Sequence, residues 1–325
     1  MMGTFGCPSS FMAFDFQHAV SAPFRMQPGL RRLAPGAAQL SPSRPGSRHL
    51  HEKLAALTMA PHEVLLQQPG FDPAPALAAL EEHACGEHPD ALQAGVQGRL
   101  HARWLGWSID AQGLAPQDDG GGAAEIGRCL QALPPAWRRA ALLALAFAED
   151  FAIVDGRSAT IPWLAVALPS HWSPADKVGR HFAEVHAPVA DNQLLITAGE
   201  HLMRLVTREE RWERFVWNIT RHPPLNNHPA RLDPAPWPAA LDADGIAALA
   251  CFRTERQTFI PVPGALQAVF TIHVESEPLA DAIAAPAEAA LLHEALATMS
   301  PAVLAYRSLA DVQQRLLAWL AARRA

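Results

Sequence analysis

Residues 249–274 read Leu249-Ala-Cys-Phe-Arg-Thr-Glu-Arg-Gln-Thr-Phe-Ile260, then Pro261-Val-Pro-Gly264, then Ala265-Leu-Gln-Ala-Val-Phe-Thr-Ile-His-Val274. The two outer segments are rich in residues that favour extended structure. The prolines and the glycine between them are typical of a turn. The stretch therefore predicts a β-hairpin, with strands over Leu249 to Ile260 and Ala265 to Val274.

The first of these strands contains six polar residues in succession, Arg253 to Thr258. Because side chains alternate along a strand, Arg253, Glu255 and Gln257 share one face, and the other three residues share the opposite face. A charged edge strand, protected against pairing with other chains, would explain this pattern. So would the wall of a polar pocket, where arginine pairs with a carboxylate and Glu255 accepts a hydrogen bond from a cation. The strand by itself leaves both interpretations open.

The remaining elements predict an α+β fold, because helices and strands occur in blocks and do not alternate as in a βαβ series. Residues 51–325 are expected to form a single domain, and residues 1–50 a loosely structured arm that packs on it through Pro23 to Leu30. The expected elements are a helical region from Leu50 to Trp107, helices near 135–149, 192–208, 287–299 and 309–323 (the last capped by Ser308), and strands near 151–154, 159–168 and 215–220.

The composition excludes several classes of protein. A net charge of -6 argues against nucleic-acid binding and against anionic membrane surfaces, both of which need a basic surface. The longest strongly apolar run, Ala140 to Ala148, is far shorter than the roughly 18 residues that span a bilayer. The four cysteines are scattered, which favours reduced thiols over disulfides or a structural zinc site. The cysteines are Cys7, Cys85, Cys129 and Cys251. We therefore expect a cytoplasmic protein with no membrane span.

Sequence signatures of several enzyme classes are absent. There is no nucleophile elbow, no phosphate-binding loop, no dinucleotide-binding glycine motif and no His-Glu-x-x-His. The run Asp118 to Gly122 is expected to be a flexible loop. His181 and His186 are five residues apart, which is a poor spacing for one metal ion on a helix. His186 stands at the end of a short apolar segment that Pro188 terminates, so it can be presented into a cavity, and one imidazole is enough to bind haem.

An ordered set of segments carries a resemblance to a known family. Leu168-Pro-Ser-His-Trp172 precedes His186-Ala-Pro-Val189, and Phe252-Arg-Thr-Glu-Arg-Gln-Thr258 precedes Val269-Phe-Thr-Ile272. Other residues of the set are Ala148-Glu-Asp150, Pro174, Lys177, Gly179, Arg214 and Trp217. Together they resemble the α subunit of haem-dependent oxidative N-demethylase and its relatives. The resemblance covers roughly Phe147 to Glu275.

The resemblance implies a PAS-like antiparallel sheet core, about residues 147–275, with flanking helices and a bound b-type haem. In that family the haem activates O₂ to oxidise a small methylated or secondary amine and release formaldehyde, and partner flavin and iron–sulfur subunits supply electrons from NADPH. By position, His186 corresponds to the proximal haem ligand. Arg253 and Glu255 would be catalytic, and Arg256, Gln257, Lys177 and Trp217 would contact the cofactor or substrate.

Two further functions are compatible with the same sequence. A PAS-like core can serve as a non-catalytic haem or ligand sensor, because a fold does not fix a function. The chain could also be a scaffold subunit that has lost haem. An absorption spectrum separates the scaffold from the other two, and amine turnover with a reductase separates the enzyme from the sensor.

Overall fold

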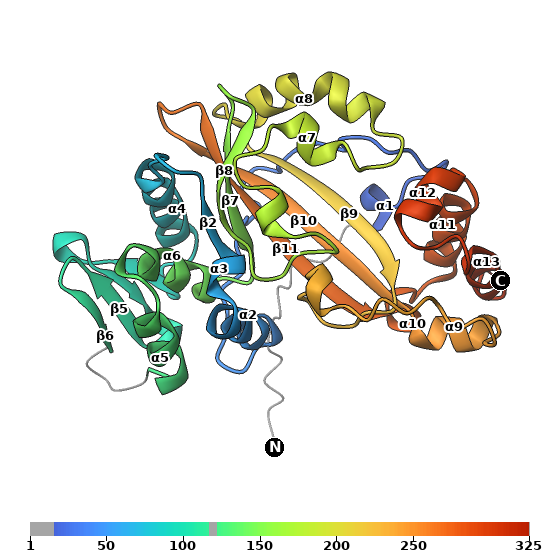
Figure 1. The fold of residues 1–325 in the computed structure, drawn as a ribbon, viewed down its shortest axis with the longest axis horizontal. Coiled ribbons are helices and arrows are strands. Elements are labelled where there is room, and N and C mark those ends of the chain that lie inside the picture. The colour runs from blue at the N-terminus through green and yellow to red at the C-terminus, as the bar shows by residue number, and fades with distance from the viewer. Residues whose placement is uncertain (1–15, 117–121, 325) are drawn as a thin grey trace, which may run out of the picture.

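A computed structural model of the chain describes residues 16–116 and 122–324. Within these residues, two open antiparallel sheets combine with 13 α-helices and four short 3₁₀ helices. The predicted α+β class is thereby confirmed. Figure 1 shows the larger sheet at the centre, the smaller sheet at one end and the C-terminal helices at the other end.

The central sheet has seven strands in the order β1-β9-β10-β11-β7-β8-β2. Its longest strands are the predicted hairpin, which is confirmed, and Gly264 adopts a φ of +73° in the connecting turn. Glycine tolerates this left-handed conformation because it has no Cβ. The strands are β1 (Arg31–Arg32), β2 (Leu65–Gln67), β7 (Asp150–Asp155), β8 (Thr160–Ala165), β9 (Trp212–Thr220), β10 (Cys251–Val262) and β11 (Gln267–Pro278).

The polar run lies in the interior of this sheet. Strand β10 pairs with β9 on one side and with β11 on the other throughout Arg253 to Thr258. Five of the six residues are buried, and only Gln257 is partly exposed. The interpretation of this segment as a charged edge strand is therefore wrong, because both edges of β10 are hydrogen-bonded to neighbouring strands.

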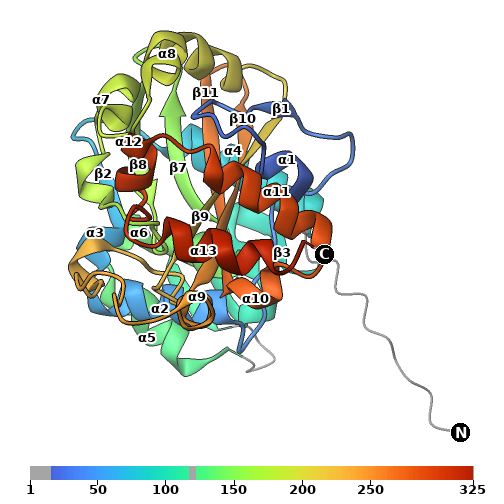
Figure 2. The same cartoon turned by 90° about the vertical axis from the view of Figure 1, so that its right-hand side faces the viewer.

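Helices surround the central sheet on several sides. Helices α7 and α8 lie together above it (Figure 1), and α4 packs against β10 and β11. Helices α11 and α13 pack on each other at the far end, in front of the sheet in Figure 2. The predicted helices at 135–149, 192–208 and 287–299 correspond to α6, α8 and α11. The helices are α1 (Phe16–Ala19), α2 (Arg48–Met59), α3 (Pro61–Val64), α4 (Ala74–Glu87), α5 (Ala124–Ala132), α6 (Pro135–Ala146), α7 (Phe182–His186), α8 (Gln193–Val206), α9 (Ala243–Leu249), α10 (Leu279–Ala282), α11 (Pro286–Ala297), α12 (Pro301–Tyr306) and α13 (Gln313–Ala321), with 3₁₀ helices η1 (Val96–Gly98), η2 (Arg103–Leu105), η3 (Pro174–Asp176) and η4 (Pro229–Arg231).

The smaller sheet corrects the prediction of a helical region up to Trp107. Helices α2 and α4 account for its first part, but residues 92–116 form four strands in the order β3-β4-β5-β6. These strands have only three or four residues each, which is too short for an alternating pattern to stand out in the sequence. They are β3 (Leu92–Ala94), β4 (Leu100–Ala102), β5 (Trp107–Asp110) and β6 (Gly113–Pro116).

The predicted helix start at Ser308 is also wrong. Ser308 has a φ of +57° and lies in the connection before α13, which begins at Gln313. A separate short helix, α12, occupies the preceding residues, and its N-cap is Ser300, whose hydroxyl oxygen accepts a hydrogen bond from the Val303 amide. The cap geometry at Ser300 satisfies an otherwise unpaired helix amide, whereas the left-handed backbone at Ser308 cannot.

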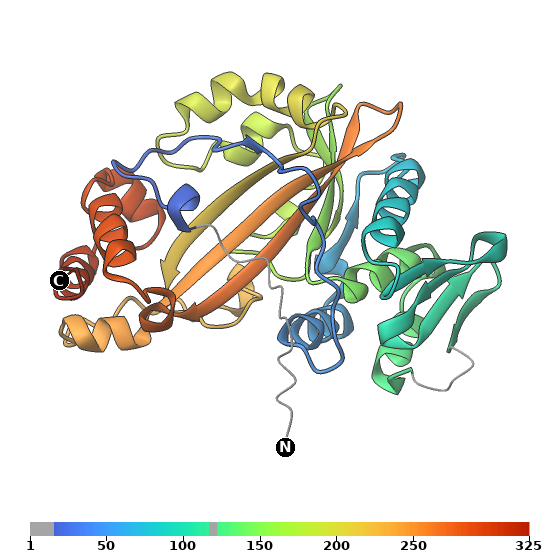
Figure 3. The same ribbon diagram turned by 180° about the vertical axis from the view of Figure 1, so that it is seen from behind.

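The N-terminal segment runs along the sheet and reaches the C-terminal helices, as Figure 3 shows from behind. Strand β1 pairs with β9 at the edge of the central sheet. The Phe24 amide donates to the Thr298 hydroxyl at 2.8 Å, and the Gln39 side chain donates to Thr258 at 2.9 Å. Residues 16–47 therefore make long-range contacts with both the sheet and the C-terminal helices.

Two further predictions concern membranes and thiols. Within residues 16–116 and 122–324, no helix is long and apolar enough to cross a membrane. Cys85, Cys129 and Cys251 are free thiols, as the scattered spacing predicted. Cys7 and most of the predicted loop at Asp118 to Gly122 lie outside the described residues.

Candidate functional site

A cavity of about 880 Å³ lies between the central sheet and the helix pair α7–α8. Strands β9 and β10 supply its polar wall, and apolar residues of β7, β11 and α8 supply much of the remainder. The volume falls in the range of roughly 300–1,000 Å³ that is usual for small-molecule and cofactor sites. This cavity is the candidate functional site.

The register of β9 against β10 determines which polar side chains share the cavity wall. Arg214 is paired with Gln257, Val216 with Glu255, and Asn218 with Arg253. Paired residues in adjacent strands project to the same side, and every second residue does so along each strand. All of these residues line the cavity.

Two polar atoms on this wall are buried and have no hydrogen-bond partner within residues 16–116 and 122–324. They are Nε of Arg214 and Oδ1 of Asn218, both on β9. Burial lowers the pKa of Arg214, and the nearby Glu255 carboxylate partly offsets this by raising it. A buried donor and a buried acceptor left unpaired cost about 1–3 kcal/mol each, so the wall is suited to a ligand that supplies the missing partners.

Arg253 projects toward the same cavity but is fully engaged by the protein. Its Nε donates to the Ser170 hydroxyl at 2.7 Å, and its two terminal nitrogens donate to the carbonyl oxygens of Leu168, Pro169, Pro224 and Leu225 at 2.6–3.3 Å. Burial lowers its pKa to about 10, against the raising effect of Glu255. The side chain ties two loops to the sheet, which is a structural role.

Glu255 and Gln257 act as a pair on the cavity face of β10. The Gln257 amide donates to a carboxylate oxygen of Glu255 and thereby fixes the orientation of that carboxylate. Glu255 is 8% exposed and Gln257 is partly exposed. A carboxylate held in this way can accept a hydrogen bond from a cationic ligand.

His186 reaches the cavity from α7. Its Nδ1 donates to the Phe182 carbonyl oxygen at 2.9 Å, and the two rings stack with centroids 4.0 Å apart. Burial lowers the pKa of His186 to about 4, and the Arg214 and Lys177 charges lower it further, against the raising effect of the Phe182 carbonyl. The imidazole is therefore neutral at pH 7, and its Nδ1–H bond leaves the Nε2 lone pair available to a ligand.

Lys177 and Trp217 also border the cavity, in different ways. The Lys177 ammonium donates to the Val185 carbonyl oxygen at 3.0 Å and so supports the turn of helix that carries His186. The Trp217 ring packs against Phe252, with centroids 5.8 Å apart, and lies under the Arg307 guanidinium at 4.9 Å. Trp217 is therefore mainly a core residue between the sheet and the C-terminal segment.

Arg256 is the one predicted site residue that the structure does not bring to this cavity. It lies on the opposite face of β10, where its Nε donates to Glu213 at 2.9 Å and a terminal nitrogen donates to the Ala38 carbonyl oxygen at 2.9 Å. The physical reason is the alternation of side chains along the strand, which separates Arg256 from Glu255 and Gln257.

The chain matches the family described as haem-dependent oxidative N-demethylase, alpha subunit-like, over residues 50–317. The chain belongs to this family. No curated protein matches it. The matched range includes every predicted site residue and all of β7 to β11, and of the cavity lining only Met26, Pro28 and Leu30 lie outside it.

Sequence reasoning did not assign a role to several cavity residues of this alpha subunit-like chain. Asn218 lies in the predicted strand 215–220 and Arg214 directly precedes it, so a period-2 reading extended to residues 214–218 places both on one face. Their alignment with Gln257 and Arg253 depends on a long-range register that the sequence does not display. His171 and His222 line the cavity with ring centroids 5.9 Å apart, although they are 51 positions apart in the chain.

Proposed function

We propose that this chain is the haem-binding subunit of an oxidative N-demethylase that acts on a small methylated or secondary amine with O₂. The observation that carries the proposal is that one cavity holds both a neutral His186 and Arg214, and that His186 Nε2 and Arg214 Nε have no partner in the described part of the chain. A haem can be held by one imidazole nitrogen that coordinates the iron and by cations that pair with its propionates.

The residues present fit a b-type haem. His186 would be the axial ligand, and its Nδ1–H bond to Phe182 fixes both the tautomer and the ring orientation. Arg214, with Lys177 close by, would pair with the propionates. A bound haem supplies the binding and activation of O₂.

The protein's own groups explain how an amine could be held beside the cofactor. Glu255, oriented by Gln257, would accept a hydrogen bond from the protonated amine. The apolar side chains of α8 that face the cavity, Leu195, Met203 and Val206, exclude water from this space. Exclusion of water strengthens the charged interactions inside it. Arg253 would contribute by positioning the loops around the site.

The proposal includes partner subunits. The family description names an alpha subunit, and turnover would need electrons from NADPH through flavin and iron–sulfur partners. We further propose a PAS-like core at about residues 147–275 within a single domain of residues 51–325, to which residues 1–50 add an arm. A cytoplasmic protein that binds neither nucleic acid nor membranes is consistent with the net charge of -6 and the free thiols.

The first test is the absorption spectrum of the purified protein after haem reconstitution. We expect a Soret band that His186→Ala weakens or shifts strongly, because the axial ligand is lost. His201→Ala is the matched control, since His201 is exposed on the neighbouring helix α8 and should leave the band unchanged. Circular dichroism confirms that both variants fold. A protein without a Soret band would contradict the proposal and favour a haem-free scaffold.

The second test separates an enzyme from a sensor. Candidate amines are titrated while the haem spectrum is recorded, and formaldehyde is then measured with NADPH and a flavin and iron–sulfur reductase. The enzyme predicts formaldehyde release that Glu255→Gln reduces. Spectral changes without formaldehyde would identify a ligand-binding sensor instead.

A further inference from the structure

A second cluster of ligating side chains lies on the opposite face of the central sheet from the cavity. It consists of His49 on α2 and of His273 and Glu275 on β11. His273 is paired with Arg256 and Glu275 with Thr254, so both project away from the cavity face of β10. This position makes the cluster independent of the proposed haem site.

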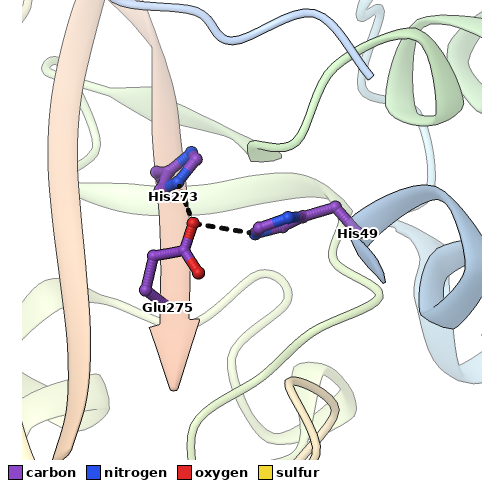
Figure 4. A group of neighbouring side chains, drawn as sticks. All are labelled: His49, His273 and Glu275. Carbon is purple, nitrogen blue, oxygen red and sulfur yellow. Dashed lines mark hydrogen bonds and ion pairs between the residues drawn. The ribbon is translucent and has the colours of Figure 1, made fainter. Parts of the chain in front are cut away.

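The three side chains converge on one point. Figure 4 shows the rings of His49 and His273 both directed at the carboxylate of Glu275. One ligand atom from each residue lies within 4.8 Å of the others. Nε2 of His273 is 3.0 Å from Oε1 of Glu275, and Nε2 of His49 is 3.7 Å from the same oxygen. Tetrahedral zinc with bonds of about 2.0–2.2 Å places its ligand atoms about 3.4 Å apart, so the two observed separations bracket the required value.

The neighbouring groups hold His273 as they would hold a metal ligand. Its Nδ1 is bound to the Glu149 carboxylate at 2.8 Å, and Glu149 is completely buried. Glu149 also accepts a hydrogen bond from the Ser41 amide, so it is itself fixed in place. Histidines that bind metals usually donate their second ring nitrogen to a carboxylate in this manner, which directs Nε2 toward the ion.

Access and charge are also suitable for a divalent ion. The Glu275 side chain is 42% exposed, whereas those of His49 and His273 are 11% and 12% exposed. Solvent can therefore reach the cluster and complete the coordination with water. The two carboxylates, Glu149 and Glu275, offset the positive charge of the ion, with Arg48 as the opposing cation nearby.

We propose that His49, His273 and Glu275 bind a divalent transition-metal ion, and that zinc suits the ligand set of two imidazoles and one carboxylate. The ion would fasten α2 to β11. On binding, His49 Nε2 exchanges its 2.7 Å hydrogen bond to the Val274 carbonyl oxygen for coordination to the metal. The proposal is separate from the haem function and does not depend on it.

The test is zinc binding by the full chain, with or without haem. The protein is stripped with EDTA, dialysed and titrated with ZnCl₂ against a chromophoric chelator. We expect one zinc ion per chain, and at least about tenfold weaker binding in His49→Ala, His273→Ala and Glu275→Gln. Glu149→Gln should weaken binding about 10–100-fold, the usual effect of losing such a partner.

The controls decide between a metal site and a network of ion pairs. His51→Ala is the matched control, because His51 is exposed on the same helix as His49 and should leave zinc affinity unchanged. Glu275→Gln keeps the test informative if a buried histidine variant fails to fold, because Glu275 is part-exposed. Zinc should raise the Tm of the parent protein and not that of Glu275→Gln. An absence of zinc binding, or equal affinity in the parent and the three ligand variants, would overturn the proposal. The zinc titration is read without reference to haem, and in protein reconstituted with haem an unchanged Soret band in all variants separates the two sites.

Discussion

The two faces of β10 carry similar residues in different states. On the cavity face, the wall formed with β9 contains Arg214 and Asn218, each with a buried polar atom that has no partner among the residues the structure describes. On the opposite face, Arg256 is paired with Glu213. Thr258 there is hydrogen-bonded to both Gln39 and Thr271. Both faces are polar. On the opposite face Arg256 and Thr258 have partners, although Oε1 of the neighbouring Gln39 finds none among the described residues.

This difference separates structural polar groups from those that await a ligand. A satisfied buried network stabilises and specifies the fold, whereas an unsatisfied one costs free energy. Each such group needs an explanation, and a role in binding a ligand is one. Arg253 refines the comparison, because it faces the cavity yet donates to four carbonyl oxygens and one hydroxyl. Whether the hydrogen-bond donors of an arginine are already used by the protein, more than the face on which it lies, indicates whether it can bind a ligand.

The largest expected effect on stability is at Glu213, on the face of the sheet opposite the cavity. Glu213→Ala should lower the free energy of unfolding by about 3–5 kcal/mol, because it removes the buried carboxylate that pairs with Arg256 and Arg31. Glu210→Ala is the matched control, since Glu210 pairs with Arg32 at the surface, and it should cost about 1 kcal/mol or less. Chemical denaturation measures both. Equal effects of the two substitutions would mean that the buried ion pair of Glu213 stabilises the fold no more than a surface pair does.

The second prediction concerns Arg214 on the cavity face. Arg214→Met should change the free energy of unfolding of the haem-free protein by less than about 1 kcal/mol, because no hydrogen bond to Nε is lost. It should nevertheless weaken haem retention by about 10–100-fold, the equivalent of one hydrogen bond to a charged group. Haem transfer to apomyoglobin measures retention, and Arg204→Met on the exposed side of α8 is the control. Strong destabilisation without haem loss would assign Arg214 a structural role.

The smallest expected effect is the contribution of the Glu87 carboxylate on α4 to stability, which depends on pH. Burial alone would raise the pKa of Glu87, but contacts from His83 and His88 and the Gln39 amide hold it below its ordinary value. A depressed carboxyl pKa stabilises the fold above the unfolded value near 4.5, and this stability is lost as the pH falls.

Glu87→Gln should therefore lower the free energy of unfolding by about 1–2 kcal/mol at pH 7. The loss is moderate because glutamine keeps one acceptor for the Gln39 and Leu40 amides. The difference from the parent protein should shrink toward pH 3. Urea denaturation across this range checks the slope, with the exposed Glu82→Gln on the same helix as the control. A constant difference at every pH would mean that the carboxylate charge is not responsible.

The sequence predicted those parts of the molecule whose signals are local. The hairpin of β10 and β11, the helices α6, α8 and α11, and the division of Arg253 to Thr258 between two faces all follow from short-range patterns. The strands at residues 92–116 were missed because they are too short to display alternation. Partners on distant segments, such as Glu213 for Arg256 and Ser170 for Arg253, depend on tertiary register, which a single sequence does not contain.

The candidate site was predicted in the same partial way. His186, Lys177, Glu255, Gln257 and Arg253 do lie at one cavity. The sequence did not indicate that the Arg253 donors are engaged, because their acceptors are backbone carbonyl oxygens of two loops. Backbone acceptors leave no trace in residue identity, so a structural arginine and a ligand-binding arginine look alike in the sequence.

The N-terminal segment contacts parts of the chain that are synthesised much later. Phe24 and Thr298 are hydrogen-bonded across 274 positions, and Met26 and Leu30 form part of the cavity wall. A ribosome adding about 5–20 residues per second needs roughly 15–55 s between these two residues. One wall of the cavity is thus made among the first residues, and it is held by β9, by β10 and by the C-terminal helices, all of which are synthesised much later. The family match begins after this segment, at residue 50. A chain shortened to the matched range would be synthesised without the piece that closes its own cavity.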